Sequence, residues 1–418
     1  MRLRYAIAML LLLVAALSVR RASAQQEEEP GAVKEPKTDF NAAPIVGGSS
    51  DIGIVGGALA AVTRLAPQRA PYLWRLEANV LATFKVDPRE STVQLPYQDY
   101  YLMLTLPHLV GNTLRLEIRP SFTREMVQRY YGIGNASPAT TPGGPEDSGS
   151  EYYQYGRMHP TLLVRAKLRL GGAFFLLLGN SFTYNQLDVS SDSKLAADMA
   201  RGTADVRQIL GDTRAHAVDL FEYGVFLDTR DNEIHTTRGM FHQIKLRLSP
   251  GGIDSMPYRY AQVNVTARGY LPIGSRIVVA GRLVGDVQFG DVPFYELTRY
   301  EDTFAIGGSN GVRGVPGQRY YGKVKAFGNL EVRASLFDFR LFKKRFSFGV
   351  AAFFDAGRVW TELGRSHPDL DGTGPGIKYG TGGGLRLRQG KTFVLRADVA
   401  WSPDATPVGG YFTMGEMF

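Results

Sequence analysis

The chain has 418 residues, of which 48 are glycine, none is cysteine and 11% are aromatic. The lack of cysteine excludes disulfides, thiolate metal sites and lipoprotein attachment. Four of the 48 lysines and arginines lie in the first 24 residues, so the remainder carries 44 basic against 40 acidic side chains. That balance is too mild to indicate nucleic-acid binding.

Residues 1–24 have the pattern of a secretory signal peptide. Two arginines precede an apolar run from Tyr5 to Val19, and Ala22-Ser23-Ala24 precedes Gln25. A membrane anchor is the alternative, but the run is shorter than the ~20 residues that span a bilayer. Residues 25–38 are polar and interrupted by proline, which predicts a disordered periplasmic leader.

From residue 39 to 418 the sequence repeatedly alternates polar with apolar residues, the period of a β-strand. The clearest alternating segments are 114–119, 164–170, 243–248, 329–336 and 393–401. A soluble β-sandwich would give the same alternation. The strands look about ten residues long, which favours a transmembrane antiparallel β-barrel. We therefore predict an all-β barrel of about 16 strands in the bacterial outer membrane, with its charged faces in the lumen.

The two ends of this domain are expected to meet and close the barrel. The predicted terminal strands lie near 42–48 and 409–418, and an aromatic last residue is frequent in outer-membrane barrels. Long polar loops near 131–152, 189–213, 300–322 and 362–376 are expected on one side, with short turns on the other. The seam between the terminal strands is rich in glycine, which weakens strand pairing, although glycine also suits barrel corners. The predicted seam residues are Gly47, Gly48, Gly409, Gly410, Gly415 and Phe418.

The loop FAIGGSNGVRGVPGQRYYG at 304–322 carries Arg313 among several glycines. A solvated loop arginine is the default interpretation, and Arg319 is expected in water. Glycine permits backbone conformations that other residues avoid, so the loop can fold back into the lumen. Two inward carboxylates, Glu331 and Asp355, follow downstream, and arginine is well shaped to bridge carboxylates.

Four motifs occur in order after residue 40, and with them the chain resembles the barrel of the BamA/TamA outer-membrane assembly-factor superfamily, or bacterial surface-antigen family. Two departures are Thr237, where the family often has proline, and Val315, where it usually has an aromatic residue. The motifs are LDTRDNEIHTTRGMF at 227–241; Phe304 with Gly307, Gly308 and Val312-Arg313-Gly314; Asn329 with Glu331 and Arg333; and FFDAGRVW at 353–360.

The resemblance implies that the loop enters the lumen and that Arg313 pairs with Glu331 and Asp355 on the inner wall. It also implies a barrel-only member, because the periplasmic substrate-binding domains of relatives that assemble or secrete proteins have no counterpart in the sequence. That departure puts an assembly role in doubt.

Three functions are compared. A barrel that opens at its seam to insert or translocate proteins or lipids is the first, a passive pore or structural barrel is the alternative, and an enzyme in the barrel wall is the third. No Ser/His or His/Asp arrangement, phosphate loop or metal-ligand spacing is recognisable, so we predict neither catalysis nor a cofactor or metal. The expected partners are outer-membrane lipids, a protein or lipid cargo and a second copy joined through the seam, with no nucleic acid.

Overall fold

The computed structural model describes residues 35–49, 53–66, 72–86, 93–111, 113–141, 144–146, 150–232, 235–301, 303–341, 344–389, 393–404 and 408–418. The predicted signal peptide and residues 25–34 of the predicted leader lie outside these ranges. The first strand begins at Lys37, two residues before the predicted domain boundary at 39.

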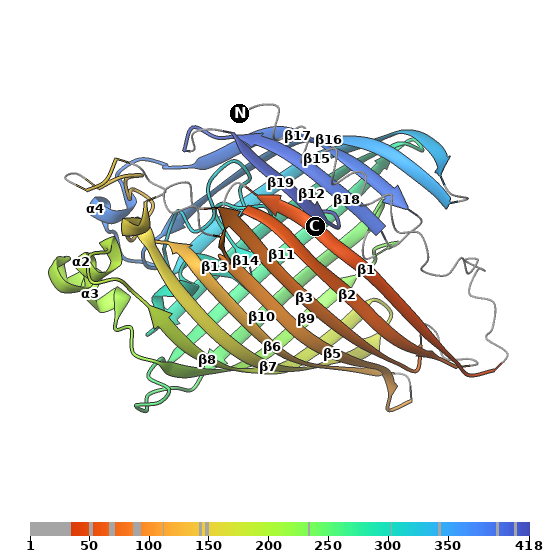
Figure 1. The fold of residues 1–418 in the computed structure, drawn as a ribbon, viewed down its shortest axis with the longest axis horizontal. Helices are drawn as coiled ribbons and strands as arrows, with labels where there is room; N and C mark the ends of the chain where they lie inside the picture. The colour runs from red at the N-terminus through yellow and green to blue at the C-terminus, as the bar shows by residue number, and fades with distance from the viewer. Residues whose placement is uncertain are drawn as a thin grey trace.

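One antiparallel sheet closes on itself to form the barrel (Figure 1). The wall strands are β1 (Lys37–Ser49), β2 (Gly53–Leu65), β3 (Trp74–Val86), β5 (Tyr97–Leu109), β6 (Leu114–Arg129), β7 (Gln154–Gly171), β8 (Phe174–Asp188), β9 (His216–Asp228), β10 (Gly239–Ser249), β11 (Tyr260–Ile273), β12 (Ile277–Gly290), β15 (Val324–Leu341), β16 (Lys344–Trp360), β17 (Lys378–Gln389), β18 (Phe393–Trp401) and β19 (Gly409–Met414). Short β4 (Val93–Gln94) pairs with β3, and β13 (Arg299–Tyr300) pairs with β14 (Thr303–Phe304). Because β1 pairs with both β2 and β19, the sheet closes.

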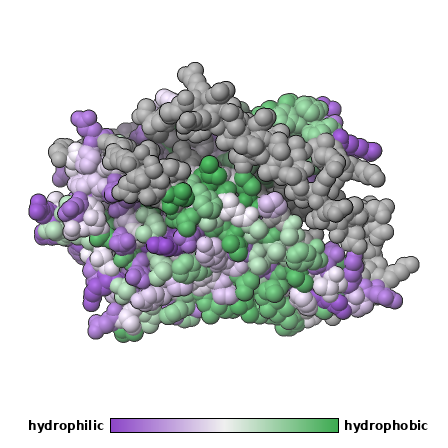
Figure 2. All heavy atoms as spheres, viewed as in Figure 1, coloured by the Kyte–Doolittle hydropathy of each residue, from purple (hydrophilic) through white to green (hydrophobic). Residues whose placement is uncertain are grey.

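The predicted barrel of about 16 strands is therefore confirmed, and the β-sandwich alternative is wrong. The alternation of the sequence explains the two faces of the wall. On β11, Gln262, Asn264 and Thr266 are buried toward the lumen, whereas Val265 between them is 45% exposed on the outside. Hydrophobic side chains spread across the outer wall in Figure 2, and hydrophilic ones gather at the end that carries the helices. Such an apolar outer band is what a lipid bilayer requires.

The long connections lie at one end of the barrel, as expected from alternate connections in an up-and-down barrel. They hold α2 (Lys194–Arg201), α3 (Ala204–Leu210) and α4 (Pro368–Asp371), which periodicity did not predict (Figure 1). Ser193 and Thr203 cap the first two helices with their hydroxyl groups. No helix among the described ranges is long and apolar enough to cross a membrane.

The loops at this end pack on one another and form a hydrophobic cap. Its buried core includes Tyr130, Leu210, Phe294 and Tyr321, which come from four separate connections or their edges. The opposite end has short turns, such as residues 172–173 and 274–276. By the usual orientation of such barrels, the short turns face the periplasm.

The last strand is shorter than predicted, and the chain end is not part of it. β19 stops at Met414, and Gly415 adopts a φ of 85°, a left-handed conformation that favours glycine. The following residues turn into the lumen, where Met417 and Phe418 pack against Tyr270, Val278 and Ala280 of the wall. The assignment of Phe418 to the seam is therefore wrong. We call Gly415–Phe418 the lumenal tail.

We expect Gly415→Ala to destabilise the barrel by about 1–2 kcal/mol, because a Cβ is strained at this positive φ. A Cβ at Gly415 would meet no atom within 4 Å, so the effect would come from the backbone alone. Gly410→Ala is the matched control, since its Cβ also has open space and its φ is not positive. Equal unfolding midpoints for the two variants in detergent would contradict this explanation of the tail.

Candidate functional site: the lumenal lock and the seam

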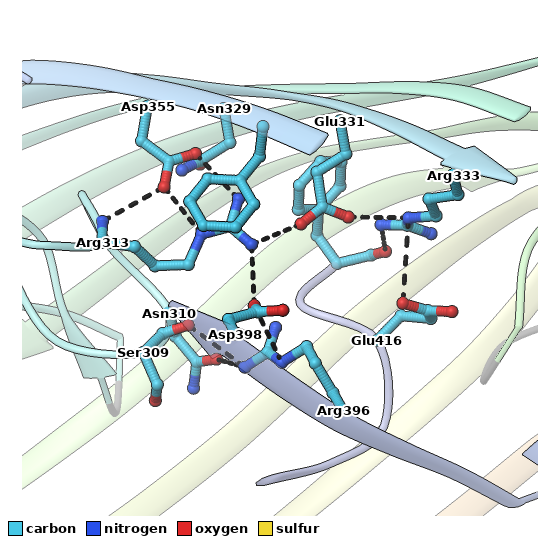
Figure 3. Close-up of polar contacts among 12 residues, drawn as sticks. Ser309, Asn310, Arg313, Asn329, Glu331, Arg333, Asp355, Arg396, Asp398 and Glu416 are labelled. Atoms are coloured by element: carbon cyan, nitrogen blue, oxygen red, sulfur yellow. Dashed lines mark hydrogen bonds and ion pairs between the residues drawn. The ribbon is translucent and has the colours of Figure 1, made fainter. Parts of the chain in front are cut away.

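Arg313 lies inside the barrel, fully buried, at the tip of the loop that follows β14 (Figure 3). Its Nε and Nη2 donate to the two carboxylate oxygens of Asp355 at 2.7 and 3.0 Å, and its backbone N–H donates to Asp355 at 3.1 Å. Its Nη1 donates to Glu331 at 2.5 Å and to Asp398 at 3.0 Å. We call this arrangement the lumenal lock. The structure thus brings Arg313 to both carboxylates expected from the sequence and adds a third.

The electrostatics of the lock favour a permanent charge on Arg313. Burial alone would lower the pKa of the Arg313 guanidinium, but its hydrogen bonds to Asp355 and the three nearby carboxylates raise that pKa above its ordinary value. The ring of Phe353 lies 3.4 Å from the guanidinium carbon and adds a cation–π contact. A guanidinium bound on all sides in this way fixes one position of the loop.

Glycines on β17 leave space in the wall where the loop approaches it. A Cβ at Gly380 on β17 would lie 1.7 Å from the carbonyl oxygen of Arg313, and one at Gly384 would lie 2.0 Å from Asp398 Oδ1. Both positions face the lumen, so any side chain there would displace the lock. The run GTGGG at 380–384 is therefore part of the site. Glycines spaced by two residues in a strand are a signal that sequence reasoning missed.

The loop itself is held by backbone geometry and by packing. Gly307, Gly308 and Gly314 have positive φ angles of 117°, 74° and 91°. Val312 is fully buried in a cluster with Val284, Phe327 and Val359 of the wall. A Cβ at Gly307 would lie 2.1 Å from the carbonyl oxygen of Pro316, so the loop crosses itself closely at that point.

Further arginines of the wall surround the carboxylates of the lock. Arg333 donates to Glu331 at 2.7 Å, and Arg386 donates to Asp398 at 2.5 Å. Arg396 of β18 holds the loop from another side, through the carbonyl oxygen of Ser309 at 3.1 Å (Figure 3). The wall thus forms a network of alternating charges, in which removal of one member leaves others buried and unpaired.

The lumenal tail joins this network through Glu416. Its carboxylate accepts a hydrogen bond from Arg386 at 3.0 Å, lies 3.8 Å from Arg333 and contacts His235 Nδ1 at 3.3 Å. The main-chain oxygen of Phe418 accepts from Arg333 at 3.2 Å. Arg333 on β15 and Arg386 on β17 therefore connect the two parts of the site, because they bind the tail directly and bind the carboxylates Glu331 and Asp398 that hold the loop.

The seam is a narrow contact. β1 and β19 share two residue pairs, Gly48 with Phe412 and Ser49 with Tyr411, whereas the β1–β2 ladder runs from Lys37 to Ser49. A Cβ at Gly47 would lie 2.8 Å from the carbonyl oxygen of Phe412, so this glycine lets the two strands approach. Among the described residues, the rest of β1 has no strand partner on this side.

Gly409, another predicted seam glycine, lies beside the loop. A Cβ there would be 3.4 Å from the Cα of Gly314. The amide of Gly314 donates to the hydroxyl of Tyr411 at 3.0 Å. The loop is therefore fixed to the last strand as well as to the wall, and the lock and the seam form one site.

The expectation that Arg319 lies in water is wrong. This residue is 5% exposed and donates to Ser137, with 2.9 Å to the hydroxyl and 2.7 Å to the carbonyl oxygen. Its guanidinium also lies over the rings of Tyr131 and Tyr320. Ser137 and Tyr131 belong to a distant loop, which the sequence around Arg319 does not reveal.

We expect Arg313→Ala to destabilise the barrel by about 3–5 kcal/mol, because three buried carboxylates would lose their shared cation. Limited proteolysis and heat-modifiable migration of the purified barrel measure the effect. Arg345→Ala is the control, since Arg345 is 74% exposed and its 2.6 Å ion pair with Asp338 is on the surface. A folded Arg313→Ala barrel as protease-resistant as Arg345→Ala would rule out the structural role of the lock.

Comparison with known proteins places this arrangement in a family. Two solved structures share the fold at low sequence identity. BamA from Haemophilus ducreyi lacking POTRA domains 1–3 is 14% identical, with a TM-score of 0.59 over 91% of this chain and 70% of that one. CdiB from Escherichia coli is 12% identical, with a TM-score of 0.55 over 90% of this chain and 62% of that one, so the chain spans less than two thirds of CdiB.

A search of curated proteins gave no match. A family model, in contrast, matches residues 91–418, which include the loop, the lock, the lumenal tail and β19. The match covers well over half of the chain and agrees with the resemblance of the four motifs. This chain belongs to the Omp85 superfamily of bacterial outer-membrane β-barrel proteins.

Proposed function

We propose that this barrel assists the insertion or translocation of proteins or lipids at the outer membrane, without catalysis, by opening at its seam. The observation that carries the proposal is the contact between β1 and β19, which is limited to two residue pairs. Every other pair of neighbouring wall strands shares six or more residue pairs among the described residues. The seam is thus the place where the wall separates at least cost in hydrogen bonds.

The position of the lock supports the same proposal. Glu331, Asp355 and Asp398 hold the loop against β15, β16 and β18, close to the seam but not across it. Separation of β1 from β19 would leave these buried ion pairs intact. The wall beside the opening would keep its shape while the two terminal strands part.

The free edge of β1 supports a partner at the seam. Unpaired backbone N–H and C=O groups on a strand edge are a template for another strand. Ile45 and Val46 lie on this edge without a partner strand on the β19 side in the described part of the chain. A cargo strand would pair there, and a second copy of this barrel would use the same edge.

Locking the seam with a disulfide should abolish function. The chain has no cysteine, so Gly48→Cys with Phe412→Cys would create the only pair. Ala60→Cys with Ala78→Cys, across the long β2–β3 ladder, is the matched control. Each variant is expressed in cells depleted of the wild type, and the outer membrane is analysed by quantitative proteomics and lipid analysis.

The expected result is loss of particular barrels, surface proteins or lipids with the locked seam, recovery with reductant and no loss with the control pair. The lost components would identify the cargo. If the locked variant restores the membrane as fully as the control, the seam does not open in function.

A passive pore is the competing proposal, and the contents of the lumen argue against it. Many inward cations are paired, for example Arg165 with Glu222 at 2.7 Å and Lys245 with Glu301 at 2.7 Å. The loop and the lumenal tail occupy the space beside β15 to β18.

We therefore expect little steady conductance from the purified barrel in planar bilayers, because the occupied lumen restricts ion flow. Deletion of residues 305–319 is the comparison, and it should raise the conductance. A large, steady, anion-selective current through the wild-type barrel would reverse the choice between the two proposals.

A further inference from the structure

A chamber of about 440 Å³ lies inside the barrel at the short-turn end. It is bounded by the turn 274–276, by Asp231 and residues 235–238 between β9 and β10, by the inner face of β15 to β17 and by Glu416 of the lumenal tail. Its volume falls in the range of small-molecule binding pockets. The chamber is separate from the seam, because none of its described lining residues belongs to β1 or β19.

The chamber is strongly basic. Five arginines line it, and the described acidic residues that line it are two, Asp231 and Glu416. The lining arginines are Arg238, Arg276, Arg333, Arg386 and Arg388. Asp231 is already occupied by its own loop, where it accepts from the Thr237 backbone and hydroxyl. Positive charge therefore exceeds negative charge within a space that the low-dielectric wall encloses.

Three of these arginines have no carboxylate within ion-pair distance among the described residues. Arg388 contacts His235, Ser335 and Ser347, none of which is a carboxylate, and its buried Nε has no acceptor among the described residues. Arg276 donates to a single carbonyl oxygen at 2.9 Å. Arg238 is the third, at the exposed mouth. Arg238 and Arg276 are exposed, whereas Arg388 is half-buried, and a cation withdrawn from water without a counter-anion is costly.

The two remaining arginines, Arg333 and Arg386, also carry N–H groups that make no hydrogen bond among the described residues. Arg333 is 4% exposed, and its Nη1 has no hydrogen-bond acceptor in the described part of the chain. Nη2 of Arg386, which is 2% exposed, makes no hydrogen bond there either, although it lies 3.6 Å from Glu331. Buried N–H groups without an acceptor are rare in folded proteins. Nearby, Arg333 already binds the main-chain oxygen of Phe418. Arg333 Nη1 and Arg388 Nε therefore remain able to donate to an oxygen atom of a ligand.

We propose that this chamber binds a phosphate group, either on the headgroup of a phospholipid or as free phosphate. A tetrahedral phosphate, singly charged in a phosphodiester headgroup and up to doubly charged when free, offers acceptor oxygens in more than one direction and matches convergent guanidinium groups. The short-turn end also lies near the level of lipid headgroups on that side of the membrane. This inference is independent of the proposed opening of the seam.

The test is binding to the purified full-length barrel in a non-ionic, phosphate-free detergent. Inorganic phosphate and short-chain phosphatidylglycerol are titrated separately, with thermal stabilisation and native mass spectrometry as readouts. Short-chain phosphatidylcholine, which has the phosphate but no net charge, is the lipid control. We expect saturable binding of at least one anionic probe that weakens as salt rises.

Variants then locate the site. Arg388→Gln should weaken binding about tenfold, because it removes a charged donor to the anion. Arg276→Gln, in an exposed turn that leaves the wall intact, should weaken it as well. Glu416→Gln should strengthen binding, since it removes one of the two lining carboxylates. Arg345→Gln is the control, because Arg345 is exposed on the same strand as part of the chamber wall and pairs with Asp338.

The outcomes separate the sources of the phosphate. Phosphatidylglycerol binding without phosphate binding assigns a lipid headgroup, and phosphate binding that competes with the lipid assigns the phosphate group itself. Failure of both probes to bind the wild type would overturn the proposal. So would binding to Arg388→Gln and Arg276→Gln as tight as to Arg345→Gln, whether or not the seam variants affect the membrane.

Discussion

A buried guanidinium determines much of this architecture. Arg313 carries its charge into the lumen, where water is replaced by protein, and such a charge is tolerated only if its N–H groups are bound and its charge is balanced. Three strands supply the carboxylates, and the aromatic ring of Phe353 covers one face. The glycine run of β17, the positive φ angles of the loop and the arginines around the carboxylates all follow from this requirement.

The lumenal tail links two properties of the barrel that would otherwise be unrelated. Because the chain turns inward at Gly415, residues that would lengthen β19 pack instead against Tyr270 and Arg333. The same turn therefore shortens the seam and fills the lumen. A longer β19 would close the wall more firmly, but it would also withdraw Glu416 from Arg386.

The sequence was sufficient to predict the strands of the wall and the pairing of Arg313 with Glu331 and Asp355. Period-two alternation identifies which residues face inward, and the motif around Arg313 identified Glu331 and Asp355. Alternation does not report how far along the barrel axis a residue lies, so Asp398, two strands from Asp355, could not be ranked above other inward acids. The prediction that Arg319 lies in water was wrong for a related reason, since its partner Ser137 lies in a loop 182 residues away. The assignment of Phe418 to the seam was wrong because the left-handed turn at Gly415 is a backbone feature that alternation cannot show.

The connectivity of the sheet has a consequence for folding kinetics. Every other wall ladder joins strands that follow one another along the chain, so each can form as a local hairpin, whereas the β1–β19 pair joins the two ends. Closing so long a segment costs conformational entropy before two residue pairs can repay it. Ring closure is therefore expected to be the last and slowest step, and until it occurs the nascent sheet carries two open edges that must be kept from aggregating.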